Sequence, residues 1–297
     1  MKTQEVENRI MEIYKERNLT FPMLQDRPYI IRISAVLPVD NEYYIYKVGS
    51  GAVSNPIDWF VLNLLRASTD AKLVGANTLR NEHTIWTVFD PSLAFLLDYH
   101  KSLGKKTDIN IILTERGDLG DKGFTEEVFN VPNRIRPVIL TTSQGHQRIL
   151  GYDRKNIRLY ELDDLEHYNF MYVQEFLHEK EPSVLVLYSG DTVNYQSAFR
   201  FFKEALEIKE ISIEAGPSIA NHLQNLDFID ELFLTVIPVD SEVELVKDGR
   251  LATESELNDE FIELSRVYGD SKGNIYPGIP ENRKESELFI FRRLRRK

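Results

Sequence analysis

The sequence predicts an α/β protein with a mostly parallel central sheet and helices on both faces. Short segments rich in β-branched residues, such as 109–115 and 136–142, are typical of buried parallel strands. These segments alternate with segments of helical periodicity, which is the pattern of a parallel sheet covered on both sides. No internal repeat or low-complexity linker divides the 297 residues. We therefore expect one domain with insertions over residues 27–297, preceded by a helical appendage over residues 1–26.

The composition excludes several kinds of protein and site. A formal net charge of −11 argues against general nucleic-acid binding. Residues 292–297 are locally basic, and we expect this tail to be a solvated end. The absence of cysteine excludes disulfides, thiolate zinc sites and cysteine nucleophiles. The six histidines show no pairing at ligand spacing, and so we expect no metal site.

Nothing in the sequence indicates export or membrane insertion. No apolar run approaches the about 20 residues that a membrane-spanning helix needs. The first 20 residues carry many charges, unlike a signal peptide. These features predict a cytoplasmic protein that acts on small molecules, with no membrane and no nucleic acid among its partners.

The N-terminal segment predicts an amphipathic helix that ends near Pro22 and packs on the main domain. Its apolar face comprises Val6, Ile10, Ile13 and Tyr14. The first strand of the domain follows at 27–37, where apolar and polar residues alternate. Arg32 lies within this strand, either as an edge-strand arginine that points at water or as a cation beside a ligand.

The best-defined helix of the sequence begins at about residue 55. Ser54 or Asn55 is a suitable N-cap. Pro56 suits the first helical position, and Asp58 suits the first turn. The core-facing stripe comprises Ile57, Phe60, Val61, Leu64 and Leu65. Arg66 follows at the helix end, where an arginine commonly complements the helix dipole.

The rest of the chain continues the alternation of strands and helices. A strand at 71–76 ends in small residues at 75–78, which start another helix. Residues 83–108 resist assignment, and their apolar cluster from Ile85 to Leu97 indicates an insertion that covers a partner. The remaining expected elements are strands at 156–162, 183–191, 231–239 and 287–294, helices at 171–177 and 194–206, and a polar, glycine-containing stretch at 251–286.

Residues 210–223 hold the clearest candidate site. Ile211 and Ile213 alternate with a serine and lead into Glu214, as in a strand that reaches its carboxyl end. The small residues around Gly216 then turn the chain into a helix, whose first N–H groups favour an anion. Ligands of open α/β sheets bind beyond the carboxyl ends of the strands. This segment therefore predicts a phosphate-bearing cofactor beside a polar substrate group, or else an ordinary strand–turn–helix corner.

Two blocks of the sequence together resemble one enzyme family. The blocks are SGAVSNPIDWFVLNLLRASTDAKLVGANTLRNE at 50–82 and IEAGPSIANHLQNLDFIDELFLTVIPV at 213–239. They are similar, in order and spacing, to the helix, the R-A-x-S-D-A link, the V-G-A-x-T turn and the E-G/A-G-P-[ST]-L-A segment of the riboflavin-biosynthesis reductase domain. That domain follows a deaminase in bifunctional deaminase–reductases. The deaminase half, with its cysteine zinc ligands, has no counterpart in this chain.

The resemblance implies a fold and an activity. The fold is that of dihydrofolate reductase, with an antiparallel C-terminal strand added to the mostly parallel sheet. The activity is the NADPH-dependent reduction of a ribosylaminopyrimidine phosphate, with hydride transfer to the ribosyl C1 of the ring-open form. The family is usually dimeric, and with the apolar cluster from Trp86 to Leu97 this implies a homodimer.

The resemblance also implies roles for individual residues. The cofactor pyrophosphate would be bound by Gly216, Pro217, Ser218, Ile219, Ala220 and Asn221. The same cofactor would be lined by Ser34, Ala52, Thr78 and Glu82. The substrate would be held by Ser50, Arg66 and Glu214. Arg32, where the family usually has a lysine near the reacting ribose, would act in catalysis together with Glu214. Arg116 and Arg80 are expected partners for the cofactor 2′-phosphate, because a guanidinium binds phosphate in a bidentate manner.

Besides Arg32, the sequence departs from the family pattern at three places. The S-x-D-G after the first strand is replaced by LPVDN, with Asp40 only loosely in register. The substrate arginine downstream of Glu82 has no clear counterpart. The Gly-Gly of the family is replaced by residues 240–242. The cofactor half is therefore the better match.

Two alternatives stay open. A pterin or dihydrofolate-type reductase on this fold needs a carboxylate early on the first helix, and Asp58 is available. A catalytically silent, nucleotide-binding regulatory protein would keep the cofactor turns and lose the substrate residues.

Overall fold

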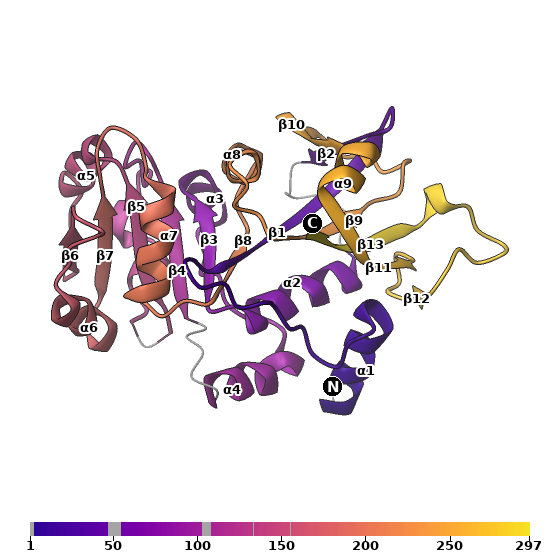
Figure 1. The fold of residues 1–297 in the computed structure, drawn as a ribbon, viewed down its shortest axis with the longest axis horizontal. Coiled ribbons are helices and arrows are strands. Elements are labelled where there is room, and N and C mark those ends of the chain that lie inside the picture. The colour runs from indigo at the N-terminus through magenta and orange to yellow at the C-terminus, as the bar shows by residue number, and fades with distance from the viewer. Residues whose placement is uncertain (1–2, 47–54, 103–107, 133, 155) are drawn as a thin grey trace.

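The computed structural model describes residues 3–46, 55–102, 108–132, 134–154 and 156–297. In this part of the chain thirteen strands form one sheet, in the order β12-β11-β13-β9-β1-β8-β3-β4-β5-β7-β6, with β2 and β10 added beside β1 (Figure 1). The parallel half of the sheet comprises β1 (Tyr29–Val39), β3 (Ala71–Gly75), β4 (Ile109–Leu113), β5 (Arg136–Thr141), β6 (Arg158–Leu162), β7 (Ser183–Tyr188), β8 (Glu210–Ile213) and β9 (Glu231–Val236). Each pairing among these strands is parallel. The predicted mostly parallel sheet is confirmed.

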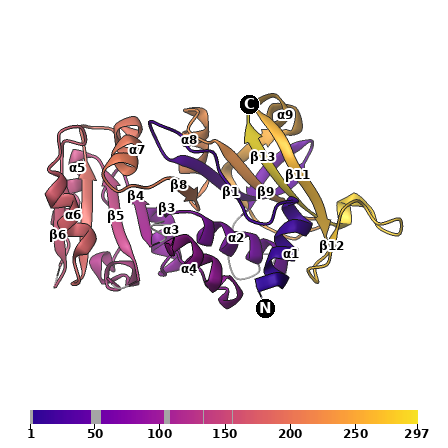
Figure 2. The ribbon, with the colours of Figure 1, turned by 60° about the horizontal axis from the view of Figure 1, so that its bottom comes forward.

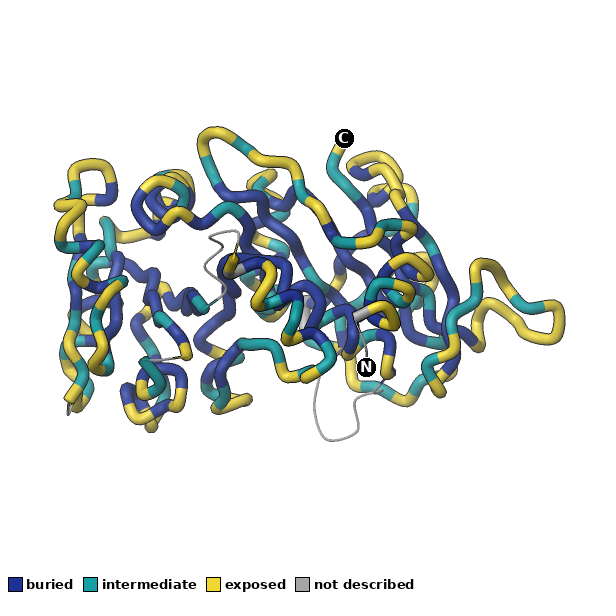
Figure 3. Tube along the Cα trace, turned by 90° about the horizontal axis from the view of Figure 1, so that it is seen from below, coloured by how far each residue is buried: buried dark blue, intermediate teal, exposed yellow. Residues whose placement is uncertain are grey.

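Helices cover both faces of the sheet, as predicted. One face of the parallel half packs against α6 (Phe170–His178), α7 (Tyr195–Glu204) and α8 (Pro217–Asn225). The other face packs against α2 (Pro56–Ser68), α3 (Ala76–Glu82) and α5 (Ser143–Leu150). In Figure 3 buried segments occupy most of the interior and exposed ones lie mainly on the outer loops. The α2 helix begins as predicted, because Asn55 accepts a hydrogen bond from the Ile57 N–H and Pro56 takes the first position.

The antiparallel half of the sheet is larger than predicted. It comprises β2 (Glu42–Tyr46), β10 (Leu245–Thr253), β11 (Phe261–Gly269), β12 (Ile275–Tyr276) and β13 (Phe289–Arg296), with α9 (Glu254–Glu260) between β10 and β11. The predicted C-terminal strand is β13, which runs antiparallel to β9. The stretch at 251–286, which the sequence described only as polar and glycine-containing, holds α9, β11 and β12. Polar residues obscure the strand character of β11, and one of them, Glu263, pairs with Arg292 of β13.

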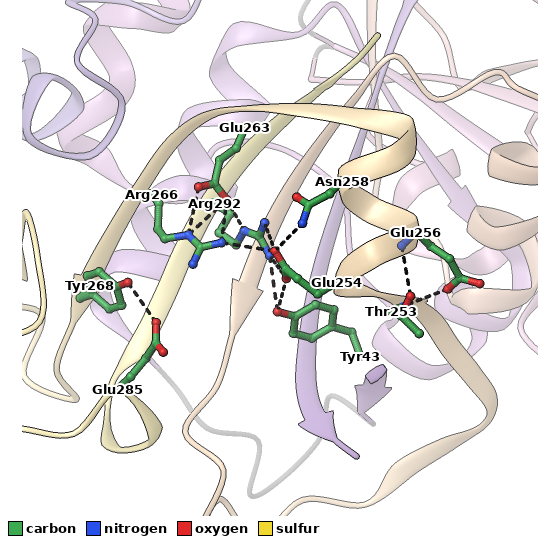
Figure 4. Close-up of polar contacts among 10 residues, drawn as sticks. All are labelled: Tyr43, Thr253, Glu254, Glu256, Asn258, Glu263, Arg266, Tyr268, Glu285 and Arg292. Carbon is green, nitrogen blue, oxygen red and sulfur yellow. Dashed lines mark hydrogen bonds and ion pairs between the residues drawn. The ribbon is translucent and has the colours of Figure 1, made fainter. Parts of the chain in front are cut away.

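The basic C-terminal segment is not a solvated end, so that expectation was wrong too. Arg292 and Arg293 are 2% and 0% exposed. Arg293 binds the fully buried Glu231 of β9. Figure 4 shows Arg292 between Glu254 and Glu263, and its two terminal nitrogens lie 2.7 and 2.9 Å from the Glu254 carboxylate oxygens. The arginines of β13 therefore stay in the sheet because acidic side chains of neighbouring elements neutralise them.

The N-terminal helix α1 (Thr3–Tyr14) is shorter than predicted. It ends at Tyr14 rather than near Pro22, and Lys15 follows in the left-handed region with φ 60°. Its predicted apolar face is buried in one core with α2 and the antiparallel strands. Figure 2 shows α1 beside α2, near the β12 end of the sheet. The division into an appendage and one domain stays a prediction.

The apolar segment after α3 packs partly into its own chain. Ile85 and Trp86 are each 1% exposed, and Leu93 and Leu96 of η1 (Pro91–Leu93) and α4 (Ala94–Ser102) are buried. Asn110 of β4 fixes Trp86, because its side chain exchanges two 3.0 Å hydrogen bonds with the Trp86 backbone. Phe89 is 41% exposed, and the expected role of the segment in covering a partner stays a prediction.

Candidate functional site

A crevice of about 940 Å³ opens at the carboxyl ends of β3, β4 and β8. Two helices begin at its wall, α3 after Gly75 and α8 after Gly216 (Figure 1). The lining residues are Gly75, Ala76, Asn77, Thr78, Arg80, Leu113, Thr114, Glu115, Arg116, Asp118, Tyr195, Gly216, Pro217, Ser218, Ile219, His222 and Val246. The crevice therefore joins the two small-residue turns of the sequence at one edge of the sheet.

The two glycines serve different purposes in this crevice. A Cβ atom on Gly216 would meet no heavy atom within 4 Å, so the backbone there borders open space. A Cβ on Gly75 would lie 2.7 Å from Cδ1 of Ile219. Gly75 thus lets α3 and α8 begin close together, and Gly216 leaves room for a ligand against the start of α8. Such a space beside a helix N-terminus fits the pyrophosphate of a dinucleotide.

The other predicted cofactor residues lie at different depths. Thr78, Pro217, Ser218 and Ile219 line the crevice. Ala220 is 2% exposed and faces the core. Asn221 and Ser34 accept hydrogen bonds from Arg32, which lies on β1 beneath α8. Glu82 is the last residue of α3 and is not part of the crevice lining. Ala52 and Ser50 lie outside the described residues.

Arg32 is completely buried under α8. Its Nε donates to Ser34 Oγ at 3.0 Å, and its terminal nitrogens donate to the side-chain oxygens of Gln224 at 2.6 Å and Asn221 at 2.7 Å. Burial lowers the pKa of Arg32 to about 9. The sequence left open whether this arginine points at water, and the structure shows that it holds α8 against β1.

Arg66 and Glu214 form a buried pair with each other. The Nη2 atom of Arg66 lies 2.5 Å from Oε2 of Glu214, and the two side chains are 6% and 7% exposed. The Nε atom lies 3.0 Å from both carboxylate oxygens, and Nη1 donates to the Thr87 carbonyl at 3.2 Å. Although burial opposes the charge, the Glu214 carboxylate raises the pKa of Arg66. The structure therefore brings together the two predicted substrate residues that it describes.

The sequence reasoning missed Lys72, which lies close to this pair. It is 0% exposed in the middle of β3, and its Nζ donates to the Thr69 carbonyl at 3.2 Å. Burial lowers its pKa to about 8, against the opposing charges of Glu214, Asp108 and Asp70. A lysine inside an otherwise apolar strand was the available signal.

Asp58 and Tyr195 are two further polar groups with shifted pKa values. Thr235 donates a hydrogen bond of 2.6 Å to Asp58, whose pKa is raised by burial. Tyr195 lines the crevice, and burial followed by the charge of Glu115 raises its pKa to about 12. Its ring centroid lies 5.4 Å from that of His222. The sequence reasoning had assigned no role to Tyr195.

The arginines expected at a 2′-phosphate both line the crevice. Arg80 already donates to the Asp118 carbonyl at 2.6 Å and to Asn77. The Asp118 carboxylate also lies 3.1 Å from Arg148. Arg116 is exposed at the crevice wall. Arg116 is thus the more available of the two predicted residues.

The described residues provide neither a metal-binding cluster nor a membrane-spanning helix. No group of three or more histidine and carboxylate side chains lies close enough to hold a metal ion. Over the same residues, helices long and apolar enough for a membrane crossing are absent.

Solved structures share the fold. A pyrimidine reductase-like protein from Corynebacterium diphtheriae is 19% identical, with a TM-score of 0.55, and the match covers 100% of this chain and 99% of that one. A diaminohydroxyphosphoribosylaminopyrimidine deaminase/5-amino-6-(5-phosphoribosylamino)uracil reductase from Thermotoga maritima is 16% identical, with a TM-score of 0.52 and coverage of 91% and 57%. RibD from Acinetobacter baumannii is 14% identical, with a TM-score of 0.51 and coverage of 92% and 59%. The chain thus spans little more than half of the latter two proteins.

Sequence comparison gives the family. No curated protein sequence matches the chain. A family model described as the RibD C-terminal domain matches residues 46–240, a span that contains both turns of the crevice and the Arg66–Glu214 pair. This protein belongs to the RibD C-terminal domain family.

Proposed function

We propose that the chain is an NADPH-dependent reductase of a ribosylaminopyrimidine phosphate in riboflavin biosynthesis. The observation that carries this proposal is the crevice between the starts of α3 and α8, with open space at Gly216. The fold and the family support it, and the Thermotoga maritima relative is named as a reductase of such a substrate. The proposed location of the protein is the cytoplasm, and its proposed partners, apart from a second copy of the chain, are small molecules.

In this proposal the crevice residues hold the cofactor. The backbone from Gly216 to Ile219 faces the pyrophosphate, and Thr78 contacts it from the start of α3. Arg116 contacts the 2′-phosphate. When bound, NADPH supplies the hydride that reduces the ribosyl C1 of the substrate. Three residues act without touching the cofactor, because they fix α8 on the sheet: Ala220, Asn221 and Ser34.

The substrate lies on the other side of the same turn. Glu214 directly follows β8, two residues before Gly216, and its carboxylate orients the pyrimidine through the N–H groups of the base. Arg66 holds this carboxylate in place and shares its guanidinium with the substrate phosphate. Arg32 has no exposed atom, so its contribution passes through α8. Contacts from Ser50, Ala52 and Glu82 complete the proposed site as predictions from the family.

A pterin reductase is the second candidate, and one observation favours it. Asp58 lies in the first turn of α2 with a hydrogen bond from Thr235, and burial raises its pKa. A fixed carboxyl group of this kind suits the adjacent amino and ring N–H groups of a pterin. The family match makes the pyrimidine the stronger candidate.

A single set of assays separates these candidates. NADPH oxidation is measured with a ribosylaminopyrimidine phosphate, in its amino and its deaminated form, and with dihydrofolate. We expect turnover with one of the pyrimidines only. Turnover with dihydrofolate would favour the pterin candidate. NADPH binding without any turnover would identify a catalytically silent nucleotide-binding protein.

The proposed homodimer rests mainly on the family. The apolar segment from Trp86 to Leu97, which also supports it, packs largely into its own chain and leaves Phe89 41% exposed. Sedimentation at micromolar concentration tests the proposal, and a monomer there would contradict it.

A further inference from the structure

Two exposed aromatic rings lie beside the buried Arg66–Glu214 pair. Trp59 of α2 is 46% exposed, and Phe89 is 41% exposed. Their rings stack, with centroids 6.3 Å apart and planes 14° apart. The Cζ atom of Arg66 lies over the Phe89 ring, 5.5 Å from its centroid. Because Trp59 and Arg66 are about two turns apart on one face of α2, the two rings and the guanidinium form a row along that helix.

The backbone that carries Phe89 is fixed to α2. Asn63, which is 0% exposed, accepts hydrogen bonds from the N–H groups of Phe89 at 2.6 Å and Asp90 at 3.1 Å. The Asn63 amide also donates to the Trp59 carbonyl at 2.9 Å. Buried contacts therefore hold an exposed ring in place. A ring that is already held in this way loses little conformational freedom when a planar group stacks on it.

The exposed area and the neighbouring charges suit a small planar anion better than a second protein chain. A little under half of a tryptophan and of a phenylalanine side chain amounts to roughly 200 Å² in total. Each side of a stable protein interface buries about 800 Å². A pyrimidine base is similar in size to one ring and can stack on it. Beside the rings, Arg66 and Glu214 offer partners for a phosphate and for the N–H groups of a base.

We propose that Trp59 and Phe89 form a stacking site for the pyrimidine base of the substrate. The base stacks on the exposed part of this ring pair, while Arg66 and Glu214 bind polar groups of the same molecule. The two rings thus determine specificity for a planar base and take no part in the hydride transfer. The identification of the base as the substrate's pyrimidine rests on the proposed function.

The fluorescence of Trp59 tests the stacking directly. The chain has two tryptophans, and Trp86 is 1% exposed. Emission is measured during titration with a ribosylaminopyrimidine phosphate and with ribose 5-phosphate, which has no base, each with and without NADP⁺. The pyrimidine should quench the wild type, and ribose 5-phosphate should not. Trp59→Phe should abolish the quenching, and because it keeps Trp86 it also corrects for light absorbed by the base.

Substitution of the second ring gives an independent measurement. Phe89→Ala should raise the KM of the pyrimidine substrate about tenfold and leave NADPH affinity unchanged. Phe89→Tyr keeps a ring and should recover most of this loss. The matched control is Phe170→Ala, which removes an exposed aromatic side chain of α6, beside β6 at the far edge of the sheet. This control should change KM by less than about twofold.

Each alternative outcome has a definite reading. A wild type that reduces the pyrimidine, with no quenching of Trp59 and an unchanged KM in Phe89→Ala, would overturn the stacking site. An unchanged KM with a dimer that dissociates in Phe89→Ala would assign the rings to a second copy of the chain and also overturn it. Quenching without turnover would refute the proposed reductase and support the stacking site. A wild type that does not bind the pyrimidine would refute both.

Discussion

Gly216, which lines the crevice, and Glu214, which pairs with Arg66, lie two residues apart on one turn, but their surroundings differ. At Gly216 the backbone faces open space in a crevice of about 940 Å³. At Glu214 the carboxylate is satisfied by three contacts with Arg66, and both side chains are nearly inaccessible. A ligand can thus enter the crevice without displacing protein contacts, whereas a substrate at Glu214 must share an existing ion pair. The proposed cofactor side is thus open before any ligand binds, and the two charges of the proposed substrate side neutralise each other.

The largest expected effect on stability comes from breaking the Arg66–Glu214 pair, the closed side of the turn. Glu214→Gln leaves Arg66 buried without its counter-charge, and removal of one partner of a buried pair costs about 3–5 kcal/mol. Chemical denaturation measures the free energy of unfolding. The matched control is Glu175→Gln, which removes an exposed partner of Arg158 and should cost about 0–1 kcal/mol. Equal losses in both variants would mean that the pair adds nothing beyond a surface contact.

A substitution at Gly216 should affect binding and spare stability. Gly216→Asp places a carboxylate where the phosphate is proposed, and we expect NADPH affinity to fall at least about 100-fold, or about 2.7 kcal/mol. Gly216→Ala is the control. Its Cβ meets open space at φ −60°, so its stability and affinity should stay near those of the wild type. An NADPH affinity that Gly216→Asp leaves unchanged would remove the crevice as the cofactor site.

Selectivity for NADPH over NADH tests the role of Arg116 in the crevice, the open side of the turn. Removing a charged hydrogen bond costs about 1.5–3 kcal/mol, so Arg116→Ala should weaken NADPH by that amount. NADH affinity in the same variant is the internal control and should not move. Wild-type protein that binds the two cofactors equally well would contradict the assignment.

Arg66→Lys tests whether the Arg66–Glu214 pair also holds substrate. Lysine keeps the positive charge beside Glu214 and removes the bidentate fork. A role in holding the substrate phosphate predicts a rise of KM by about tenfold, equivalent to about 1.4 kcal/mol, with unchanged NADPH affinity. If Arg66 only complements the helix dipole and neutralises Glu214, turnover in the lysine variant should equal that of the wild type.

A pH-dependent effect concerns Lys72, the buried lysine near the Arg66–Glu214 pair. Burial lowers its pKa from the ordinary 10.5 to about 8, so between these values the unfolded chain binds more protons than the folded one. Stability relative to Lys72→Met should therefore rise with pH from about 8 to 10, by about 2 kcal/mol. Denaturation curves across this range measure the difference. A difference that is constant with pH would show that Lys72 titrates normally.

Much of the parallel half could be predicted because its signals are local. The caps of α2 at Asn55 and Pro56, the stripe of that helix and the β-branched strands each depend on neighbouring residues. The crevice was foreseeable for the same reason, since residues 210–223 carry a strand end, a turn and a helix start in one continuous segment. The antiparallel half was harder to predict because its strands carry charges that only become acceptable once paired.

Tertiary structure alone decided how the charged residues are used. Arg66 and Glu214 are 148 positions apart, and Arg32 and Asn221 are 189 apart. No periodicity encodes such distances, so a helix-end arginine and a strand arginine looked like solvent-facing or ligand-facing groups. The sequence by itself determined the turn that borders the crevice. Only the packing of α2 and α8 on the sheet decided that Arg66 neutralises Glu214 and that Arg32 is buried with neutral partners, because a charge is compensated by what surrounds it in space.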